Sequence, residues 1–345
     1  MRPREHVQDA VGELGRRIRA LEDRLLTERL SVYGVAVSRI LGAFAYVGIL
    51  VTNFGHRELL FGNGSGWVQV YRQSSPQRVW LGLLDGASGF VFTAFYLAVI
   101  AVGIAFVLGW HARVTGPLLL LGAVQIIELN PLVGDQGDNI LRIGLLLILF
   151  TDNSAVWSLD ALRRREDRPP RWAVAARIRD WIDGPAVGTA KTILHNAAVI
   201  AIAGQLVIVY ISAGLFKAGG EVWRFGTAIA YPMLLDEYRV WPFLNDFVVS
   251  SAVGVWLMTY TAVFLQLYFP PLLLNRVTRR IALAAVILLH VGIAVLMALP
   301  WFSLAMVAFD SIFVSRSTYE ALGRWATRLR AGALSRVDGR VRRSA

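Results

Sequence analysis

Lysine is rare in this chain, and one of its two lysines closes a long apolar segment. Of 35 basic residues only Lys191 and Lys217 are lysine, and Lys217 follows the apolar run 205–216. An amine in a low-dielectric site can lose its proton near neutral pH, whereas a guanidinium cannot, so Lys217 could act as a general base. A second interpretation is that Lys217 extends its ammonium group to water from the end of a membrane helix.

Further polar residues lie within or beside apolar segments. His290 lies near the middle of the apolar segment 281–299, where a histidine can be catalytic or can hydrogen-bond between helices. Asp138, Asn139 and Arg142 follow a short acidic turn and are expected on the same side of a membrane as Lys217. We interpret His195, near the other end of the segment that carries Lys217, as structural.

Motifs for a metal or a nucleotide are not found in the sequence. The chain has no cysteine, its five histidines do not have the spacing of metal ligands, and no HExxH occurs. Neither a phosphate-binding loop nor a dinucleotide fingerprint is present. We therefore expect no metal and no nucleotide cofactor.

Composition predicts the fold class. Hydrophobic residues make up 56% of the chain, charged residues only 17%, and the mean hydropathy is +0.53. Several apolar segments approach the 20 residues or so that cross a bilayer as a helix. The sequence predicts an all-α, polytopic membrane bundle of about eight transmembrane helices. These are expected at about 33–53, 87–110, 117–130, 140–151, 192–216, 247–274, 281–299 and 301–315.

The charges of the loops predict the orientation of these helices. With eight spans, the arginine-rich loops 111–116, 152–190 and 275–280 fall on one side, and the acidic loops 131–139 and 217–246 on the other. Positively charged loops remain in the cytosol, so both termini are expected there and the protein in the cytoplasmic membrane. The net charge of +11 then reflects topology and contact with membrane lipids rather than binding of nucleic acid.

Three regions follow from this pattern. Residues 1–30 are expected to form an amphipathic helix on the cytoplasmic membrane surface, because apolar residues recur there at steps of three and four. A short coiled coil between two copies is the alternative for this helix. Residues 31–315 form the transmembrane domain, and residues 316–345 a basic cytoplasmic tail. Arg39, inside the first predicted span, should face the bundle or the interface.

Three stretches carry a resemblance to a known family. The stretch 210–217, Tyr-Ile-Ser-Ala-Gly-Leu-Phe-Lys, with Trp223 and Gly226 after it, resembles the lysine segment of vitamin K-dependent γ-carboxylase. The stretch 137–142, Gly-Asp-Asn-Ile-Leu-Arg, and His290 with Phe302 and Ser303 after it are also similar to this group. Residues 30–315 thus resemble the bacterial HTTM (horizontally transferred transmembrane) domain family.

The resemblance implies a specific chemistry. In the carboxylase, the lysine matching Lys217 deprotonates a naphthohydroquinone, whose oxygenation gives the strong base that removes a γ-proton from a glutamyl side chain before carbon dioxide adds. Lys217 and His290 are then the expected catalytic residues, and Asp138, Asn139, Arg142 and Trp223 are expected to bind the substrate or the quinone. The expected cofactor is a reduced naphthoquinone, either menaquinol or vitamin K hydroquinone.

The chain also departs from the carboxylase. Phe216 stands where the carboxylase has a second lysine, and the short basic segment 316–345 stands where it has a large lumenal domain. A glutamyl-containing substrate could therefore be replaced by another. The alternative is a non-catalytic membrane protein that helps to mature, export or tolerate a secreted peptide. The HTTM group includes such a protein, which helps to mature a sporulation-delaying toxin.

Overall fold

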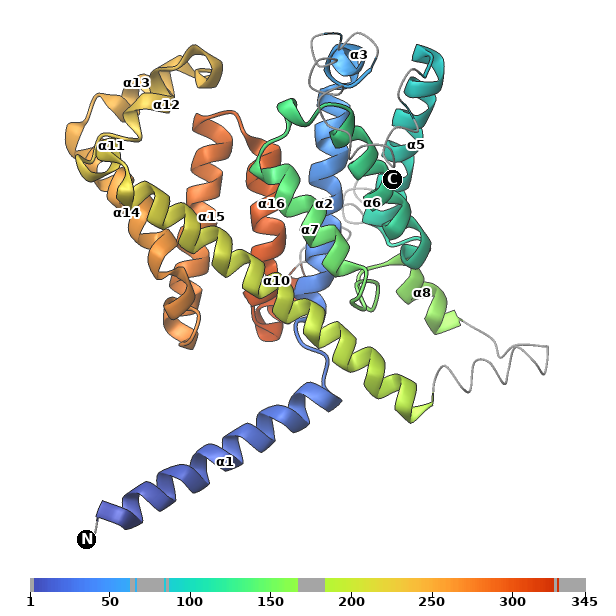
Figure 1. The fold of residues 1–345 in the computed structure, drawn as a ribbon, viewed down its shortest axis with the longest axis vertical. Helices are drawn as coiled ribbons and strands as arrows, with labels where there is room; N and C mark the ends of the chain where they lie inside the picture. The colour runs from blue at the N-terminus through green and yellow to red at the C-terminus, as the bar shows by residue number, and fades with distance from the viewer. Residues whose placement is uncertain are drawn as a thin grey trace, which may run out of the picture.

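The computed structural model describes residues 3–62, 66, 84, 87–166, 184–325 and 328, and their regular structure is entirely helical. Figure 1 shows the arrangement of the helices. The α-helices are α1 (Pro3–Thr27), α2 (Val32–Thr52), α3 (Arg57–Leu60), α5 (Gly89–Leu108), α6 (Ala112–Leu129), α7 (Gln136–Ile148), α8 (Leu159–Glu166), α10 (Pro185–Gly219), α11 (Glu221–Arg224), α12 (Ala230–Leu234), α13 (Pro242–Val249), α14 (Ala252–Leu272), α15 (Arg276–Leu296) and α16 (Pro300–Asp310). Short 3₁₀ turns lie at Phe54–His56, Pro131–Val133, Asp236–Tyr238 and Ser311–Phe313.

Six helices of the described part are long and apolar enough to cross a membrane, namely α2, α5, α6, α10, α14 and α15. The prediction of an all-α membrane bundle is confirmed at this level. The other two predicted spans form α7, with 13 residues, and α16, with 11. At 1.5 Å per residue α7 is about 20 Å long, which is less than the roughly 30 Å hydrocarbon core. The count of eight spans therefore stays a prediction.

The short helix α16 is enclosed by its neighbours. α16 begins at Pro300, directly after the end of α15, and packs against α2, α15 and α7. Six of its eleven residues are buried, including Met306, Phe309 and Asp310. A helix enclosed in this way does not need to match the thickness of the bilayer by itself, since its neighbours shield it from lipid.

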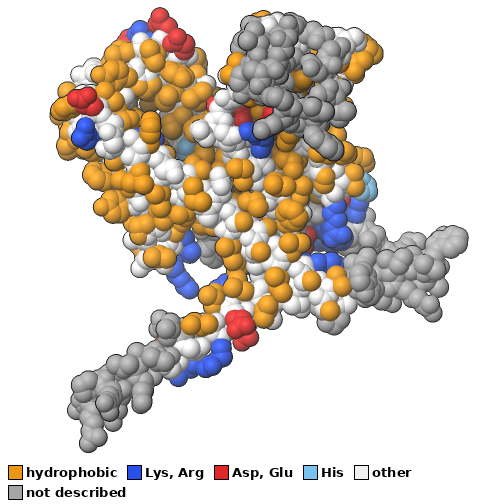
Figure 2. Space-filling model, in the orientation of Figure 1, with side chains coloured by type: hydrophobic (Ala, Val, Ile, Leu, Met, Phe, Trp, Pro, Cys, Tyr) orange, Lys and Arg blue, Asp and Glu red, His pale blue; other side chains and the backbone are white. Residues whose placement is uncertain are grey.

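The helices of the bundle run alternately in opposite directions, so their connections gather at two ends (Figure 1). The lower end carries α8 with Arg163, Arg164 and Arg165, and the turn before α15. The upper end carries α3 and the α11–α13 segment, whose acidic residues include Glu221, Asp236 and Asp246. Hydrophobic side chains cover the middle of the face drawn in Figure 2. The two ends therefore differ in charge as the loops predict.

Which end faces the cytosol is a prediction that labelling can check. The chain has no natural cysteine, so single cysteines can be introduced at Gly219 on the upper end and at Arg165 on the lower end. Both positions are exposed. We expect Gly219→Cys to react with an impermeant maleimide in intact cells, and Arg165→Cys only after permeabilisation. Reaction of Arg165→Cys in intact cells would show that the lower end faces outward and would contradict the predicted orientation.

Two terminal regions were predicted outside the bundle. α1 covers most of residues 1–30 and extends away from the bundle at its lower end (Figure 1). Its last turn is joined to α10, because Asn196 donates hydrogen bonds to the carbonyls of Leu25 and Glu28. The surface-helix and coiled-coil interpretations of α1 both remain predictions. The predicted tail 316–345 falls mostly outside the described residues.

Among the described residues Arg39 is the largest fully buried side chain, and it faces the bundle. Its guanidinium donates to four backbone carbonyls, those of Phe106 at 2.5 Å, Val107 at 2.6 Å, Trp157 at 2.7 Å and Asn153 at 3.0 Å. Gly109, with φ +64°, ends α5 beside it, and a Cβ there would lie 2.9 Å from Nη1 of Arg39. Arg39 therefore satisfies the last carbonyls of α5 and fixes the loop that follows α7.

Candidate functional site

Lys217 lies in the last turn of α10 and contacts Trp223, which belongs to the same stretch of the family resemblance. The helix ends at Gly219, and Gly220 leaves room for Trp223 of α11 to fold back, since a Cβ there would lie 3.0 Å from Trp223 Cδ1. The Lys217 Nζ atom lies 5.3 Å from the centroid of the Trp223 ring. The Lys217 residue is only partly exposed. A cation over an indole face is attracted to the ring, so this contact holds the side chain and stabilises its ammonium form.

The face of α10 that carries Lys217 continues inward along the helix. Tyr210, Gly214 and Lys217 follow at steps of four and three, which places them on one side of an α-helix. Gly214 brings α10 against α14, since a Cβ there would lie 2.8 Å from Leu267 Cγ. Two helical turns, about 10 Å, separate Tyr210 from Lys217 along the axis.

A buried polar cluster lies at Tyr210, where α10 meets α15 and α16. The Tyr210 hydroxyl donates to Oδ2 of Asp310 at 2.6 Å and lies 3.3 Å from Nε2 of His290. All three side chains are at most 2% exposed. Nδ1 of His290 and Oδ1 of Asp310 have no hydrogen-bond partner within the described residues. Buried polar atoms without partners are uncommon because each is destabilising, so this cluster is a candidate for function.

One aromatic ring connects this cluster with the acidic turn before α7. The Phe302 ring of α16 lies 5.9 Å from the His290 ring. On its other side Phe302 lies against Gly137, where an added Cβ would be 3.2 Å from Phe302 Cα. Gly137 thus permits the close approach of α7 and α16. The turn that holds Asp138 is therefore one side chain away from His290.

Asp138, Asn139 and Arg142 lie together on the first turns of α7, where they also serve local structure. Asp138 and Asp135 form a capping box, in which each side chain accepts a hydrogen bond from the backbone of the other. Arg142 donates to Asn139 at 2.5 Å and to Glu128 of α6 at 3.3 Å. Burial raises the pKa of Asp138 above its usual value, while the hydrogen bond from Asp135 N opposes that shift.

Asp138 also lines a cavity of about 160 Å³ at the upper end of the bundle. The cavity lies between α2, α3 and α6, and Tyr46 and Asn130 contribute to its wall. The buried Tyr46 hydroxyl has no hydrogen-bond partner within the described part of the chain. Lys217 does not line this cavity, and of the α7 residues only Asp138 does. The predicted site residues therefore fall into three groups: Lys217 with Trp223, His290 in the Tyr210 cluster, and the α7 residues beside the cavity.

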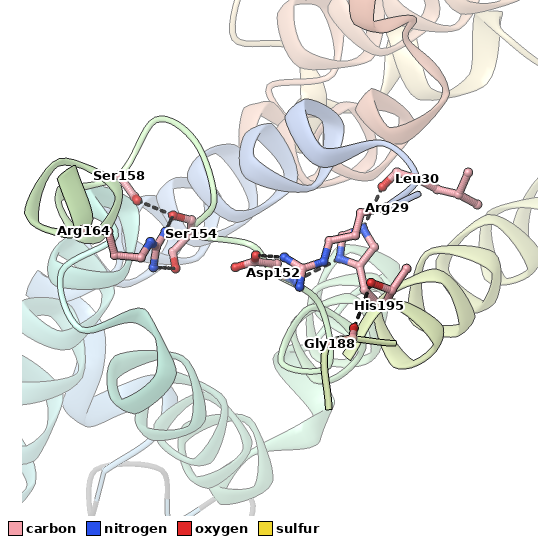
Figure 3. Close-up of polar contacts among 9 residues, drawn as sticks. Arg29, Leu30, Asp152, Ser154, Ser158, Arg164, Gly188 and His195 are labelled. Carbon is pink, nitrogen blue, oxygen red and sulfur yellow. Dashed lines mark hydrogen bonds and ion pairs between the residues drawn. The ribbon is translucent and has the colours of Figure 1, made fainter. Parts of the chain in front are cut away.

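His195 has a structural role, in line with its interpretation from the sequence. Its Nδ1 accepts a hydrogen bond from the backbone N–H of Asp152 at 2.9 Å, and its Nε2 lies 2.7 Å from the carbonyl oxygen of Leu30. Figure 3 shows these contacts between α10, the segment after α1 and the segment after α7. Both ring nitrogens are thus engaged with backbone at the lower end of the bundle.

Tyr210, Asp310 and Phe302 were not predicted as site residues. The sequence signal for Tyr210 and Asp310 is that polar residues interrupt apolar segments, and Asp310 is the stronger case because it is an acidic residue in an apolar segment. Phe302 carries no such signal. His290 and Asp310 lie 80 and 100 residues after Tyr210 along the chain. Helical spacing identifies the face on which each lies but does not show which faces meet.

The Tyr210 hydroxyl offers a direct test of the cluster. Tyr210→Phe removes the only described hydrogen bond to the Asp310 carboxyl group and leaves that group buried. We expect a loss of about 1–3 kcal/mol in the free energy of unfolding, because a buried acceptor loses its donor. Thermal unfolding in detergent measures this loss of stability. The control is Tyr268→Phe, the same substitution at an exposed tyrosine. Equal stability of the two variants would contradict this network.

Long apolar helices that enclose a polar cluster are the features of a multi-pass helical membrane protein. Comparison with known families makes this more specific: residues 185–317 match the HTTM domain. The resemblance to the HTTM family is thereby confirmed for the segment from the start of α10 to the end of the α16 region. This segment contains Lys217, Trp223, His290 and Asp310. Neither the curated proteins nor the solved structures gave a match.

Proposed function

We propose that this protein is a membrane enzyme of the γ-carboxylase-like type, with a reduced naphthoquinone as cofactor and Lys217 as the base. The observation that carries this proposal is the buried cluster of Tyr210, His290 and Asp310, which has two polar atoms without a partner among the described residues and lies on the Lys217 face of α10. A site that binds only by apolar contact would have no need of such atoms.

Residues of the cluster and of the Lys217 end of α10 support a reduced naphthoquinone as the cofactor. A hydroquinone is a flat, apolar double ring that carries two hydroxyl groups, so its site needs aromatic surfaces and hydrogen-bond acceptors. Trp223 and Phe302 supply aromatic rings, and Nδ1 of His290 and Oδ1 of Asp310 are acceptors without partners in the described chain. When bound, the hydroquinone would supply a weakly acidic hydroxyl group and the electrons that reduce oxygen.

Each protein group then has a distinct role. Lys217, as the free amine, accepts a hydroxyl proton and becomes an ammonium, which the Trp223 ring stabilises. The new ammonium can release its proton to water because it lies in the last turn of α10, only partly covered. Tyr210 and Asp310 orient the His290 ring. The role proposed for the α7 group, Asp138 with Asn139 and Arg142, is to bind the second substrate, for which the resemblance implies a glutamyl side chain.

The quinone pool tests this function. Lipid extracts are compared by mass spectrometry from cells that carry the wild-type protein, no protein or Lys217→Arg. We expect oxidised or epoxidised quinone to accumulate only with the wild-type protein. An identical quinone profile in all three kinds of cell, with the wild-type and variant proteins present in the membrane where expressed, would contradict the quinol-dependent function.

A second candidate function follows from the upper end of the bundle. The α11–α13 segment exposes large apolar side chains, namely Phe225, Tyr231, Leu234, Leu235, Val240, Trp241, Phe243 and Phe247. Such a surface suits contact with an extended peptide, as in a protein that helps to mature, export or tolerate a secreted peptide. Photo-cross-linking from Phe243 would capture a small peptide under this hypothesis, and Lys217→Arg would leave the capture unchanged.

A further inference from the structure

An open pocket of about 500 Å³ lies at the lower end of the bundle, where α2 begins (Figure 1). Three aromatic rings line it, those of Tyr33 at the start of α2, Trp157 in the loop after α7, and Tyr319. Tyr319 belongs to the helical segment 316–325, which follows the 3₁₀ turn after α16. The other lining residues lie in this segment or directly after it, namely Glu320, Gly323, Arg324 and Arg328.

The rings of Tyr33, Trp157 and Tyr319 pack on one another and form an aromatic wall. The centroid of the Tyr33 ring lies 5.3 Å from that of Trp157 and 5.9 Å from that of Tyr319. The Trp157 and Tyr319 rings are 5.8 Å apart and nearly perpendicular, at 84°. The Tyr319 hydroxyl donates to the carbonyl of Ser311 at 2.7 Å, which fixes its ring. These distances are favourable for aromatic pairs, so the aromatic wall is already formed before a ligand binds.

Trp157 is the strained member of the aromatic wall. Its φ is +50°, in the left-handed region that bulky residues rarely adopt. Its carbonyl oxygen accepts a hydrogen bond from the buried Arg39 at 2.7 Å, which holds the backbone there, yet Trp157 stays 44% exposed. Backbone strain of this kind is concentrated at functional sites, so an exposed indole held in this way points to a ligand.

The charge that the pocket offers to a ligand is positive. Glu320 is the only acid among the described residues that line it, and its carboxylate accepts a hydrogen bond from Arg316 in an ion pair of 2.7 Å. Arg324 and Arg328 follow Glu320 at steps of four, the spacing of neighbours on one helix face, and both are exposed. Neither forms an ion pair with another described residue. The two guanidinium groups are therefore available to an anion.

The position of the pocket indicates which kind of anion reaches it. α2 is long and apolar enough to cross a membrane, and Tyr33 is its second residue. The segment 316–325 exposes Leu322 and Trp325, which are three residues apart and lie on one face. Tyrosine and tryptophan side chains concentrate at the level of the lipid headgroups. This position favours the phosphate of a lipid headgroup over a soluble anion.

We propose that this pocket binds the phosphate group of an anionic phospholipid such as phosphatidylglycerol. Arg324 and Arg328 bind the phosphate, and the aromatic wall packs against the glycerol and ester groups. Arginine binds phosphate oxygens through paired N–H groups, and basic sites at the membrane surface attract anionic headgroups. A choline headgroup would place a further positive charge beside the arginines. The site is independent of the proposed enzymatic function, because it shares no residue with the groups around Lys217, His290 and Asp138.

The test is a titration of the full chain in a neutral detergent with three probes: dihexanoyl phosphatidylglycerol, dihexanoyl phosphatidylcholine and inorganic phosphate. We expect phosphatidylglycerol to bind most tightly. Arg324→Gln/Arg328→Gln should raise its dissociation constant roughly 25-fold, at about fivefold for each charge. The matched control is Arg276→Gln/Arg280→Gln, which changes two exposed arginines of the same spacing at the same end of the bundle, outside the pocket. It should bind phosphatidylglycerol as the wild type does.

Trp157→Leu tests the aromatic wall without a change in charge. It should raise the dissociation constant of phosphatidylglycerol about threefold, and it carries the comparison if the double variant of the pocket does not fold. Equal weakening in the two double variants would show a general effect of charge and overturn the proposal, as would wild-type affinity in either pocket variant. Tighter binding of phosphatidylcholine would also overturn it. Inorganic phosphate bound as tightly as phosphatidylglycerol would identify the free anion as the ligand and overturn the lipid.

Discussion

Replacing Lys217 with arginine is expected to lower turnover about 10²–10⁴-fold, the usual contribution of a positioned general base. Arginine retains the positive charge, the length of the side chain and the attraction to the Trp223 ring. It cannot give up its proton near neutral pH, so only the proton-accepting role is lost. The readout is the rate at which the hydroquinone is oxidised by the purified protein in vesicles.

A matched control separates this effect from a change in folding or insertion. Arg276 is an exposed residue at the start of α15, at the other end of the bundle. Arg276→Lys changes a basic side chain by the reverse substitution, and its turnover should equal that of the wild type. Both variants should elute as the wild type does in size-exclusion chromatography. Wild-type turnover in Lys217→Arg would show that Lys217 is an interfacial cation and not a base.

Replacing Arg39 with leucine is expected to give the largest loss of stability, about 3–5 kcal/mol. The substitution removes a buried cation and its hydrogen bonds to four carbonyls, those of Phe106, Val107, Asn153 and Trp157. Within a membrane no water reaches such groups, so they stay unsatisfied. The free energy of unfolding in detergent measures the loss.

Arg39→Lys refines the Arg39 prediction, because it preserves the charge but not the planar fork of donors. A single ammonium cannot reach carbonyls on both α5 and the loop after α7, so we expect this variant to lie between the wild type and Arg39→Leu. Arg276→Leu, at an exposed position, should leave the free energy of unfolding within about 0.5 kcal/mol of the wild type. Equal stability of Arg39→Leu and Arg276→Leu would show that the carbonyl contacts contribute little.

The sequence by itself determined the membrane class, the positions of the helices and the difference in charge between the two ends. These features depend on local composition, which apolar length and loop charge report directly. The contact of Lys217 with Trp223 joins two residues that are close in the chain, and Gly220, where a Cβ would lie 3.0 Å from Trp223 Cδ1, leaves room for it. The eight predicted segments all form helices, but α7 and α16 are shorter than a span. α16 packs against α2, α15 and α7, whereas α7 still exposes Ile143 and Leu146.

Only the tertiary structure decided which polar side chains meet. Tyr210, His290 and Asp310 come from three helices, and the carbonyls that bind Arg39 come from α5 and a distant loop. In a membrane helix both the buried and the lipid-facing sides are apolar, so the pattern that marks the inner face of a soluble helix is weak. Apolar length therefore gave the helices, whereas their mutual rotation and contacts depended on packing between segments far apart in the chain.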